Sequence, residues 1–456
     1  MWTYSVSLLE RPFPRVTAGR CLSLTGATPS GGELCGKQRA AMTAYTPTLM
    51  ELHRAEGPLK VLLLENIHPK AVELFRSEGF DVETVAGALK EDELCKKLES
   101  VHVLGIRSKT QVTRRALEAA PRLLSLGCFC IGTNQVDLDS AKARGVPVFN
   151  APFSNTRSVA ELIIAEIVLL ARQLGDRSRE VHEGKWRKVA AGCYEIRGKT
   201  LGIIGYGHIG SQLGVIAEAL GMNVMFFDIA TKLPMGNNHA VESMDELLAK
   251  SDFVTLHVPA TQQTHEMFGE REIARMQKGS FLLNASRGTV VVIPALAAAL
   301  RAGHLAGAAI DVYPEEPESN SDGFVTPLQN LTNVILTPHI GGSTIEAQAA
   351  IGSEVGNSLV RYVATGATTG SVNFPPVELP PNKATHRVLN VHRNVPGVLR
   401  DINAIVSELG ANISSQVLAT DASIGYLVMD IEKDVAQSVA ERIAALTTDI
   451  RTRVLY

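Results

Sequence analysis

The chain has 456 residues, of which 45% are hydrophobic and 20% charged, and its formal net charge is −3. This balance is that of an ordinary globular protein and argues against nucleic acid or an anionic membrane as the main partner. The six cysteines are few and irregularly spaced, so the sequence predicts reduced thiols in a cytoplasmic protein, with no disulfide framework and no metal site. The length predicts about three domains.

The N-terminal segment, residues 1–54, differs from the rest of the chain. It scatters basic residues among many Gly, Ser and Thr and has no sustained hydrophobic period. Such a composition predicts disorder. An alternative is that Met42 is the true start of the protein.

From Leu59 onward, apolar runs alternate with helical patterns. Strands are predicted in LKVLLLE, FDVETV, VHVLGI and LLSLGCFC, with helices between them. This alternation indicates a parallel, doubly wound α/β sheet. A long helix from about Thr156 to Leu174 then leads into a second α/β unit.

The second unit contains a dinucleotide-binding motif. An apolar run ends in Gly205-x-Gly207-x-x-Gly210, a helical stretch follows, and a second apolar run ends at Asp228. The first glycine permits the tight turn, the second lets the backbone approach a pyrophosphate, and the third lets helix and strand pack closely. The acid accepts hydrogen bonds from a ribose diol and repels a 2′-phosphate, so NAD is favoured over NADP.

Six strand candidates follow Lys199, enough for a complete Rossmann sheet. A Pro-rich stretch at 373–382 then predicts a linker. Residues 383–456 read in the order βαββαβ, which is typical of a ferredoxin-like module. This module is predicted to bind a small effector or another subunit, and a purely structural dimerisation module is the alternative.

Three residues near the ends of the later strands have the chemistry for hydride transfer. Arg287 offers a cationic fork that matches a carboxylate. His339 can accept the proton of a secondary alcohol, and Glu316 can orient the imidazole and raise its pKa. Each also has a simpler interpretation, because Arg287 could form a surface ion pair and His339 could lie in an ordinary turn.

The segments NASRGTVV, DVYPEEP and TPHIGGST, in this order after GYGHIG, resemble the signatures of the D-isomer-specific 2-hydroxyacid dehydrogenases. The resemblance extends from about Leu59 to Tyr456. It implies a Rossmann NAD-binding domain (155–341) inserted in a flavodoxin-like substrate-binding domain (55–154 and 342–372). It also implies a C-terminal ACT regulatory domain (383–456) after the linker.

The resemblance assigns roles to individual residues of this chain. Arg287, Glu316 and His339 fall on the family's catalytic positions. The expected cofactor contacts lie in the glycine motif, at two strand ends and in the turn around His339. They are Gly205, Gly207, His208, Ile209, Gly210, Asp228, Ala285, Ser286, Arg287, Asp311, His339, Ile340, Gly341 and Gly342.

The substrate and effector sites follow from the same resemblance. Arg107 and Ser108, with Asn155 as a further candidate, are expected to bind the substrate's phosphate from the other lobe, while Arg287 binds its carboxylate. In the ACT domain, His392, Asn394 and Asn412 match the effector positions. We expect one small amino acid, L-serine, to touch all three.

The implied reaction is NAD-dependent oxidation of 3-phospho-D-glycerate to 3-phosphooxypyruvate, at the start of L-serine biosynthesis. The implied assembly is a homo-oligomer, a tetramer by the resemblance. An alternative substrate is another D-2-hydroxy acid, such as 2-hydroxyglutarate formed from 2-oxoglutarate. A different class of function is a nucleotide-sensing regulatory protein, but an intact Arg, Glu and His set favours the enzyme.

Overall fold

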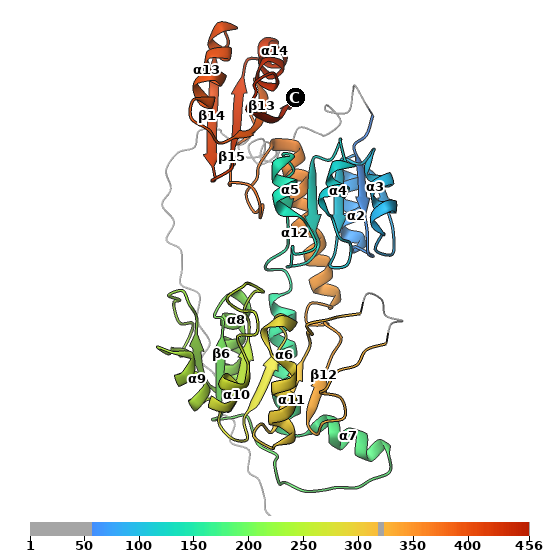
Figure 1. Ribbon diagram of the computed structural model, residues 1–456, viewed down its shortest axis with the longest axis vertical. Coiled ribbons are helices and arrows are strands. Elements are labelled where there is room, and N and C mark those ends of the chain that lie inside the picture. Colours follow the sequence, from blue (N-terminus) through green and yellow to red (C-terminus); the bar gives the residue numbers. More distant parts are fainter. Residues whose placement is uncertain (1–56, 318–322, 456) are drawn as a thin grey trace, which may run out of the picture. The chain divides into compact units, whose positions relative to one another are not determined.

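The computed structural model describes residues 57–317 and 323–455, and the predicted disorder of residues 1–54 lies outside them. The described part of the chain contains three sheets, of five, seven and four strands (Figure 1). Each sheet has its own helices, and the strands of the first two sheets pair in parallel throughout. The fold is therefore α/β with a separate antiparallel module, as the sequence predicted.

The first sheet has the strand order β2-β1-β3-β4-β5. Alternate side chains of its strands enter two different cores, which is why these strands read as continuous apolar runs. Helices α2 and α12 pack on one face, and α3, α4 and α5 on the other. The elements are β1 (Lys60–Leu63), α2 (Pro69–Ser77), β2 (Asp81–Thr84), α3 (Glu91–Leu98), β3 (Val103–Ile106), α4 (Arg114–Glu118), β4 (Ser125–Cys128), α5 (Leu138–Ala143), β5 (Val148–Phe149) and α12 (Ile345–Thr365).

The predicted long helix from Thr156 to Leu174 corresponds to helix α6, and a second helix, α7, begins where the predicted helix ends. Helix α6 spans Thr156–Ala171 and α7 spans Leu174–His182. Between them Gln173 takes a left-handed conformation with a φ of 52°, which ends the first helix and turns the chain. The helical period thus marked α6 but neither the break at Gln173 nor helix α7.

The second sheet has the order β12-β11-β10-β9-β6-β7-β8, with one more strand than the six predicted. The extra strand, β8, has only two residues. Helices α6 and α8 pack on one face and α9, α10 and α11 on the other (Figure 1). The elements are β6 (Thr200–Ile204), α8 (His208–Ala219), β7 (Asn223–Phe227), β8 (His239–Ala240), α9 (Met244–Lys250), β9 (Phe253–Leu256), α10 (Glu270–Arg275), β10 (Phe281–Asn284), η3 (Gly288–Val290), α11 (Ile293–Arg301), β11 (Gly307–Ile310) and β12 (Val334–Leu336).

The third sheet is antiparallel, in the order β14-β15-β13-β16, and the chain order is the predicted βαββαβ. Its two helices cover one face. Side chains on the other face, including Leu389 and Tyr426, share a core with Phe149 and Tyr362. The elements are β13 (His386–Arg393), α13 (Val398–Glu408), β14 (Ile413–Thr420), β15 (Ile424–Ile431), α14 (Lys433–Ala444) and β16 (Asp449–Leu455).

The Pro-rich stretch 373–382 has no helix or strand, in keeping with its four prolines. Its first half is nevertheless anchored. The Asn373 carboxamide accepts a hydrogen bond from the backbone N–H of Val148 (2.8 Å) and donates one to the Val146 carbonyl (3.1 Å), and Phe374 and Val377 are buried. This half of the stretch is thus packed, not a free tether.

Among the described helices, none combines the length and the apolar character that a membrane crossing requires.

Candidate active site

The glycine motif has the geometry that dinucleotide binding requires. Gly205 has a φ of 92°, and a Cβ there would lie 2.4 Å from the carbonyl oxygen of His257. A Cβ at Gly210 would lie 2.3 Å from the carbonyl oxygen of Gly205, whereas one at Gly207 would meet nothing within 4 Å. Helix α8 begins directly after Gly207, so the N–H groups of its first turn are available to an anion.

Asp228 follows strand β7 and closes the βαβ unit. Its two carboxylate oxygens accept hydrogen bonds from the backbone N–H groups of Tyr206 (2.8 Å) and Ala230 (2.9 Å). These bonds fix the carboxylate beside the glycine turn and leave further lone pairs on both oxygens. The arrangement fits a ribose diol.

His339 and Glu316 form a close pair. The imidazole Nδ1 lies 2.8 Å from a carboxylate oxygen of Glu316, whose other oxygen accepts a hydrogen bond from the backbone N–H of Tyr313 (3.2 Å). The hydrogen bond to Glu316 raises the pKa of His339 above its usual value, against the opposing effect of burial. Burial alone would raise the pKa of Glu316, but the bond to His339 brings it below the usual value. With Nδ1 engaged, Nε2 is the nitrogen left for a substrate proton.

The backbone around His339 is held by Asp311. Its buried carboxylate accepts hydrogen bonds from the N–H groups of Ile340 and Gly341 (both 2.8 Å) and from the Thr337 hydroxyl (2.6 Å). His339 itself has a left-handed φ of 55°. The side chain of Asp311, predicted as a cofactor contact, thus fixes the turn that carries the histidine.

Arg287 lies directly after strand β10 on a tightly packed turn. Its guanidinium donates to the Ser286 carbonyl (2.7 Å), and the Asn284 carboxamide donates to the Arg287 carbonyl (3.0 Å). A Cβ on the next residue, Gly288, would overlap the Tyr313 backbone at 1.9 Å, so only glycine fits there. Burial lowers the pKa of Arg287, but guanidinium groups stay charged in proteins.

The predicted phosphate-binding residues lie in a loop after strand β3. The Glu65 carboxylate accepts hydrogen bonds from the backbone N–H groups of Arg107 (3.2 Å), Lys109 (3.0 Å) and Thr110 (2.8 Å). The Gln135 carboxamide donates to the Arg107 carbonyl (2.6 Å). The sequence predicted no site role for Glu65 or Gln135. Glu65 nevertheless ends the apolar run LKVLLLE, just as Asp228 ends the second apolar run of the dinucleotide-binding motif.

The structure brings Arg107 and Arg287 close to one group. Burial raises the pKa of the Cys130 thiol, and the positive charges of Arg107 and Arg287 both oppose that rise. The Gln135 carboxamide, which donates to the Arg107 carbonyl, also contacts the Cys130 thiol (3.3 Å), and a Cβ at Gly132 would lie 3.5 Å from the Arg287 guanidinium. A substrate with two anionic ends needs a cation for each end.

Two further predicted residues are placed differently. The Asn155 side chain lies against the backbone of Gly342, and its buried Oδ1 has no hydrogen-bond partner in the described structure. The Ser286 hydroxyl donates to the Asn284 carboxamide (2.7 Å) and is buried. Asn155 therefore packs against the turn of Gly342 with an unsatisfied buried oxygen, whereas the Ser286 side chain is hydrogen-bonded within the protein.

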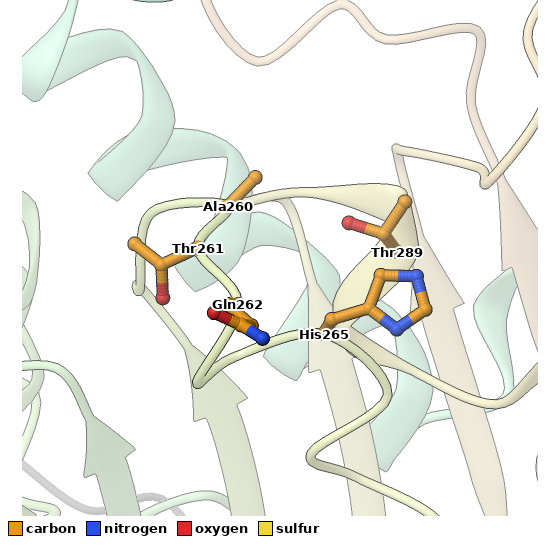
Figure 2. Close-up of a pocket in the computed structure, with 5 residues that line it drawn as sticks. All are labelled: Ala260, Thr261, Gln262, His265 and Thr289. Atoms are coloured by element: carbon orange, nitrogen blue, oxygen red, sulfur yellow. The ribbon is translucent and has the colours of Figure 1, made fainter.

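A shallow, open depression lies at the carboxyl ends of strands β9 and β10 (Figure 2). It is lined by residues of the loop after β9 and by Thr289, two positions beyond Arg287. The lining residues are Ala260, Thr261, Gln262, His265 and Thr289. None of them was predicted, because no charged or glycine-rich motif marks this loop. The carboxyl ends of parallel strands are where α/β sheets bind ligands.

In the C-terminal module, the three predicted effector residues do not lie together in one subunit. His392 pairs with Gly425 at one end of β15, whereas Ile413, which follows Asn412, pairs with Ile431 at the other end. Six residues along a strand correspond to roughly 20 Å. The expectation that one small amino acid touches all three residues is therefore wrong for a single chain.

Comparison with known proteins shows which protein families the chain resembles. Residues 164–341 match the model of the D-isomer specific 2-hydroxyacid dehydrogenase NAD binding domain, and residues 389–451 match the model of the AHAS small subunit-like ACT domain. Together the two matches cover the glycine motif, Arg287, Glu316, His339 and most of the antiparallel module.

The chain is similar to named relatives over most of its length. It is 58% identical over 398 residues to D-3-phosphoglycerate dehydrogenase of Dictyostelium discoideum, covering 87% of this chain and 97% of that one. It is 53% identical over 401 residues to the Escherichia coli K12 enzyme of the same name, covering 87% and 98%. Among solved structures, D-lactate dehydrogenase from Aquifex aeolicus, complexed with NAD and lactic acid, matches with a TM-score of 0.61 and 27% identity, covering 69% of this chain and 99% of that one.

Proposed function

Because the chain belongs to the D-isomer-specific 2-hydroxyacid dehydrogenases, a family of NAD-binding oxidoreductases, we propose that it oxidises 3-phospho-D-glycerate to 3-phosphooxypyruvate, the first step of L-serine biosynthesis. Both relatives above are named for the phosphoglycerate reaction. The observation in the site that carries the proposal is the pair of His339 and Glu316, 2.8 Å apart, on a turn fixed by Asp311.

Each of the three catalytic residues has a distinct task. Nε2 of His339 takes the proton of the C2 hydroxyl, and the Glu316 carboxylate stabilises the imidazolium that forms. Arg287 binds the substrate carboxylate in a bidentate manner, which fixes the C2 hydrogen. NAD, when bound, accepts this hydrogen as a hydride.

The substrate's phosphate is assigned to the loop of Arg107 and Ser108. Gln135 links the Arg107 backbone to the Cys130 thiol, and the Arg287 guanidinium lies beside Gly132, which supports binding of one small molecule with an anion at each end. Asn155 stays a further candidate for the phosphate, to which its carboxamide NH₂ group could donate. The same two cations suit the second carboxylate of 2-oxoglutarate, so reduction of 2-oxoglutarate to 2-hydroxyglutarate is a second candidate activity.

The substrate assignment is tested by initial rates of NADH formation. We expect kcat/KM to be highest for 3-phospho-D-glycerate, lower for D-2-hydroxyglutarate and lowest for D-glycerate, which lacks the second anion. Arg107→Ala should raise KM for 3-phospho-D-glycerate and for D-2-hydroxyglutarate, which each carry a second anionic group. The KM for D-glycerate should stay unchanged. Equal kcat/KM for D-glycerate and 3-phospho-D-glycerate would contradict the proposed phosphate site.

The C-terminal module is assigned to control by L-serine. The match to an ACT domain supports an amino-acid effector. His392 is buried and Asn394 bonds through its carboxamide to the Asp421 carbonyl (2.7 Å), whereas Asn412 is exposed at the far end of the sheet. A serine that contacts all three residues needs a second copy of the chain, with Asn412 from one subunit and His392 and Asn394 from the other.

A homo-oligomer is also supported by helix α7 and the segment after it. Five large apolar side chains there are exposed, and Trp186 has 84% of its surface accessible. Contiguous exposed apolar surface is typical of protein interfaces, and these side chains lie along one segment of the chain. They are Leu174, Val181, Trp186, Val189 and Tyr194. We assign this face to a second copy of the chain, and Trp186→Glu should lower the molar mass measured by light scattering.

The limits of the domains and the cytoplasmic location of the protein stay predictions. A substrate-binding domain at 55–154 and 342–372, a Rossmann domain at 155–341 and an ACT domain at 383–456 agree with the separate sheets and their cores. Four cysteines in the described residues are free thiols, which suits a cytoplasmic protein.

A further inference from the structure

Glu65 is a buried carboxylate that the proposed mechanism does not use. It follows strand β1 and exposes only 7% of its surface. One oxygen accepts hydrogen bonds from the N–H groups of Arg107 (3.2 Å) and Thr110 (2.8 Å), and the other accepts from Lys109 (3.0 Å). All three donors belong to the loop after β3. The carboxylate therefore accepts hydrogen bonds from three backbone amides of the loop that carries Arg107 and Ser108.

The backbone at Glu65 is strained, which indicates that its position is imposed. Glu65 has a φ of 63° and Asn66 a φ of 52°, two successive non-glycine residues in the left-handed region. Such a conformation is unfavourable for a residue with a side chain and persists only where the surrounding contacts impose it. The same turn brings the Glu65 carbonyl within 3.5 Å of the Arg107 guanidinium. Strain of this kind gathers at functional sites.

The loop is held from the other side as well. The buried Gln135 carboxamide donates to the Arg107 carbonyl (2.6 Å), so bonds from two distant segments fix the backbone of Arg107. Glu65 precedes its loop partners by more than 40 residues, and without it three backbone donors would lose their acceptor. A loop free to move would present its cation and hydroxyl less often in the binding conformation, and the substrate would bind more weakly.

We propose that Glu65 is a positioning residue that holds the loop of Arg107 to Thr110 in the conformation that receives the substrate's phosphate. The inference rests on the proposed function, because it takes this loop as the phosphate site. Glu65 acts through the backbone and touches neither the substrate nor the cofactor.

The test is the steady-state kinetics of Glu65→Gln, which keeps the size of the side chain but places an NH₂ group opposite backbone donors. We expect KM for 3-phospho-D-glycerate to rise about tenfold, since bonds from the loop to a charged acceptor are lost. KM for NAD, kcat and the KM for D-glycerate should not change. The matched control is Glu83→Gln. Glu83 is a surface carboxylate on strand β2 of the same sheet and pairs with Lys97 of helix α3, so this variant should behave as the unaltered protein.

A double variant separates the Glu65 inference from the proposed function. If Glu65 acts only through the loop, Glu65→Gln should add nothing to the KM of Arg107→Ala. A raised KM in Arg107→Ala with an unchanged KM in Glu65→Gln would overturn the Glu65 inference alone. An unchanged KM in both variants would overturn the phosphate site as well.

A merely structural role gives a different pattern. It would lower kcat, raise KM for NAD and lower Tm together, and that result would also overturn the inference. If Glu65→Gln does not fold, Glu65→Asp retains the charge with a shorter reach. That variant should show a smaller rise in KM for 3-phospho-D-glycerate, and an unchanged KM would contradict the proposal.

Discussion

His339 shows how much local structure supports one reacting group. It takes a left-handed backbone conformation that non-glycine residues rarely adopt, and its N–H donates to the Asp311 carbonyl (2.8 Å). Together with the bonds from the Asp311 carboxylate to Ile340 and Gly341, this fixes where the imidazole lies. Glu316 then fixes how the ring is turned.

Replacing His339 by alanine should lower kcat by roughly 10²–10⁴, which is what a positioned general base contributes. NAD binding, measured by fluorescence titration, should survive, because the task proposed for the imidazole is to take the proton of the substrate's hydroxyl. Turnover equal to that of the unaltered protein would remove His339 from the mechanism.

Glu316→Gln should change the pH profile of kcat/KM. The reaction needs neutral His339, so the rate falls as pH drops through the pKa of this residue, which Glu316 holds above its usual value. Removing the negative charge lowers that pKa, so the acidic limb should move to lower pH. The rate on the plateau should also fall, because the ring is held less well. An acidic limb that does not move would contradict the assigned pair.

Arg287, Glu316 and His339 could be proposed as catalytic residues from the sequence because each lies in a long motif that follows a strand. The role of Glu65 could not be predicted, since its partners are backbone amides more than 40 residues away and any acid at a strand end looks the same in sequence. Ser286 and Asp311 stay predictions as cofactor contacts. Their internal hydrogen bonds depend on the folded turn and leave no mark in the sequence.

At the level of the elements, helix α6 carries an acid into the core. Glu166 is 2% exposed on this helix, and burial, together with the charge of Asp311, raises its pKa to about 8. The acid is therefore protonated in the folded state and ionised in the unfolded state between pH 4.5 and about 8. Across this window the unfolded state binds fewer protons, so stability falls as pH rises.

Glu166→Gln should remove this dependence on pH. At acidic pH, where Glu166 is neutral in both the folded and the unfolded state, the Tm of the variant should equal that of the unaltered protein. At alkaline pH the variant should have a higher Tm than the unaltered protein. The gain in free energy of unfolding should be several kcal/mol at most, by about 1.4 kcal/mol for each unit of pKa shift. Parallel Tm curves for the two proteins from acidic to alkaline pH would contradict a neutral Glu166.

Arg387, a buried cation on strand β13, forms hydrogen bonds with segments outside the antiparallel module. The Arg387 guanidinium is fully buried, pairs with Asp430 (2.7 and 2.9 Å) and donates to the carbonyls of Thr365, Leu379 and Pro380. These carbonyls belong to the end of α12 and to the Pro-rich stretch. Arg387 therefore connects the antiparallel module with both.

Arg387→Met should lower the free energy of unfolding by about 3–5 kcal/mol, because it leaves Asp430 buried without its partner. Adding Asp430→Leu should recover part of the loss, since the unpaired charge disappears. Urea unfolding of both variants measures this. A loss below about 1 kcal/mol in the single variant would show that water or another cation replaces the guanidinium.

The element order could be predicted more completely than the element limits. Hydrophobic periods identified the three sheets, whereas the break at Gln173 depends on a single left-handed residue and the two-residue strands β5 and β8 are too short to show a period. The register of the antiparallel module is set by tertiary packing. It separates Asn412 from His392, and the sequence carries no sign of that separation.

For the molecule as a whole, the third sheet is part of a shared core. Leu389 and Tyr426 pack with Phe149 and Tyr362, and the Tyr426 hydroxyl donates to the Gly366 carbonyl (2.6 Å). Deleting residues 383–456 would expose this core. A point substitution therefore tests serine control better than a truncation does.

Asn394→Ala should weaken inhibition by L-serine, measured as the concentration that halves NADH formation, while kcat without serine is unchanged. A coupling between effector and active site is typically worth about 1–3 kcal/mol, so its loss should be easily seen. The control is Gln437→Ala on the exposed side of α14, which should be inhibited normally. Serine inhibition that persists in Asn394→Ala would leave subunit association as the role of the module.

The transfer of the C2 hydrogen tests the central claim most directly. With 3-phospho-D-glycerate deuterated at C2, the protein should form NADH that carries one deuterium for each molecule of 3-phosphooxypyruvate released. Arg287→Ala and His339→Ala should slow this transfer and keep the same stoichiometry in what remains. NADH without deuterium, or no NADH at all from this substrate, would contradict the proposed reaction.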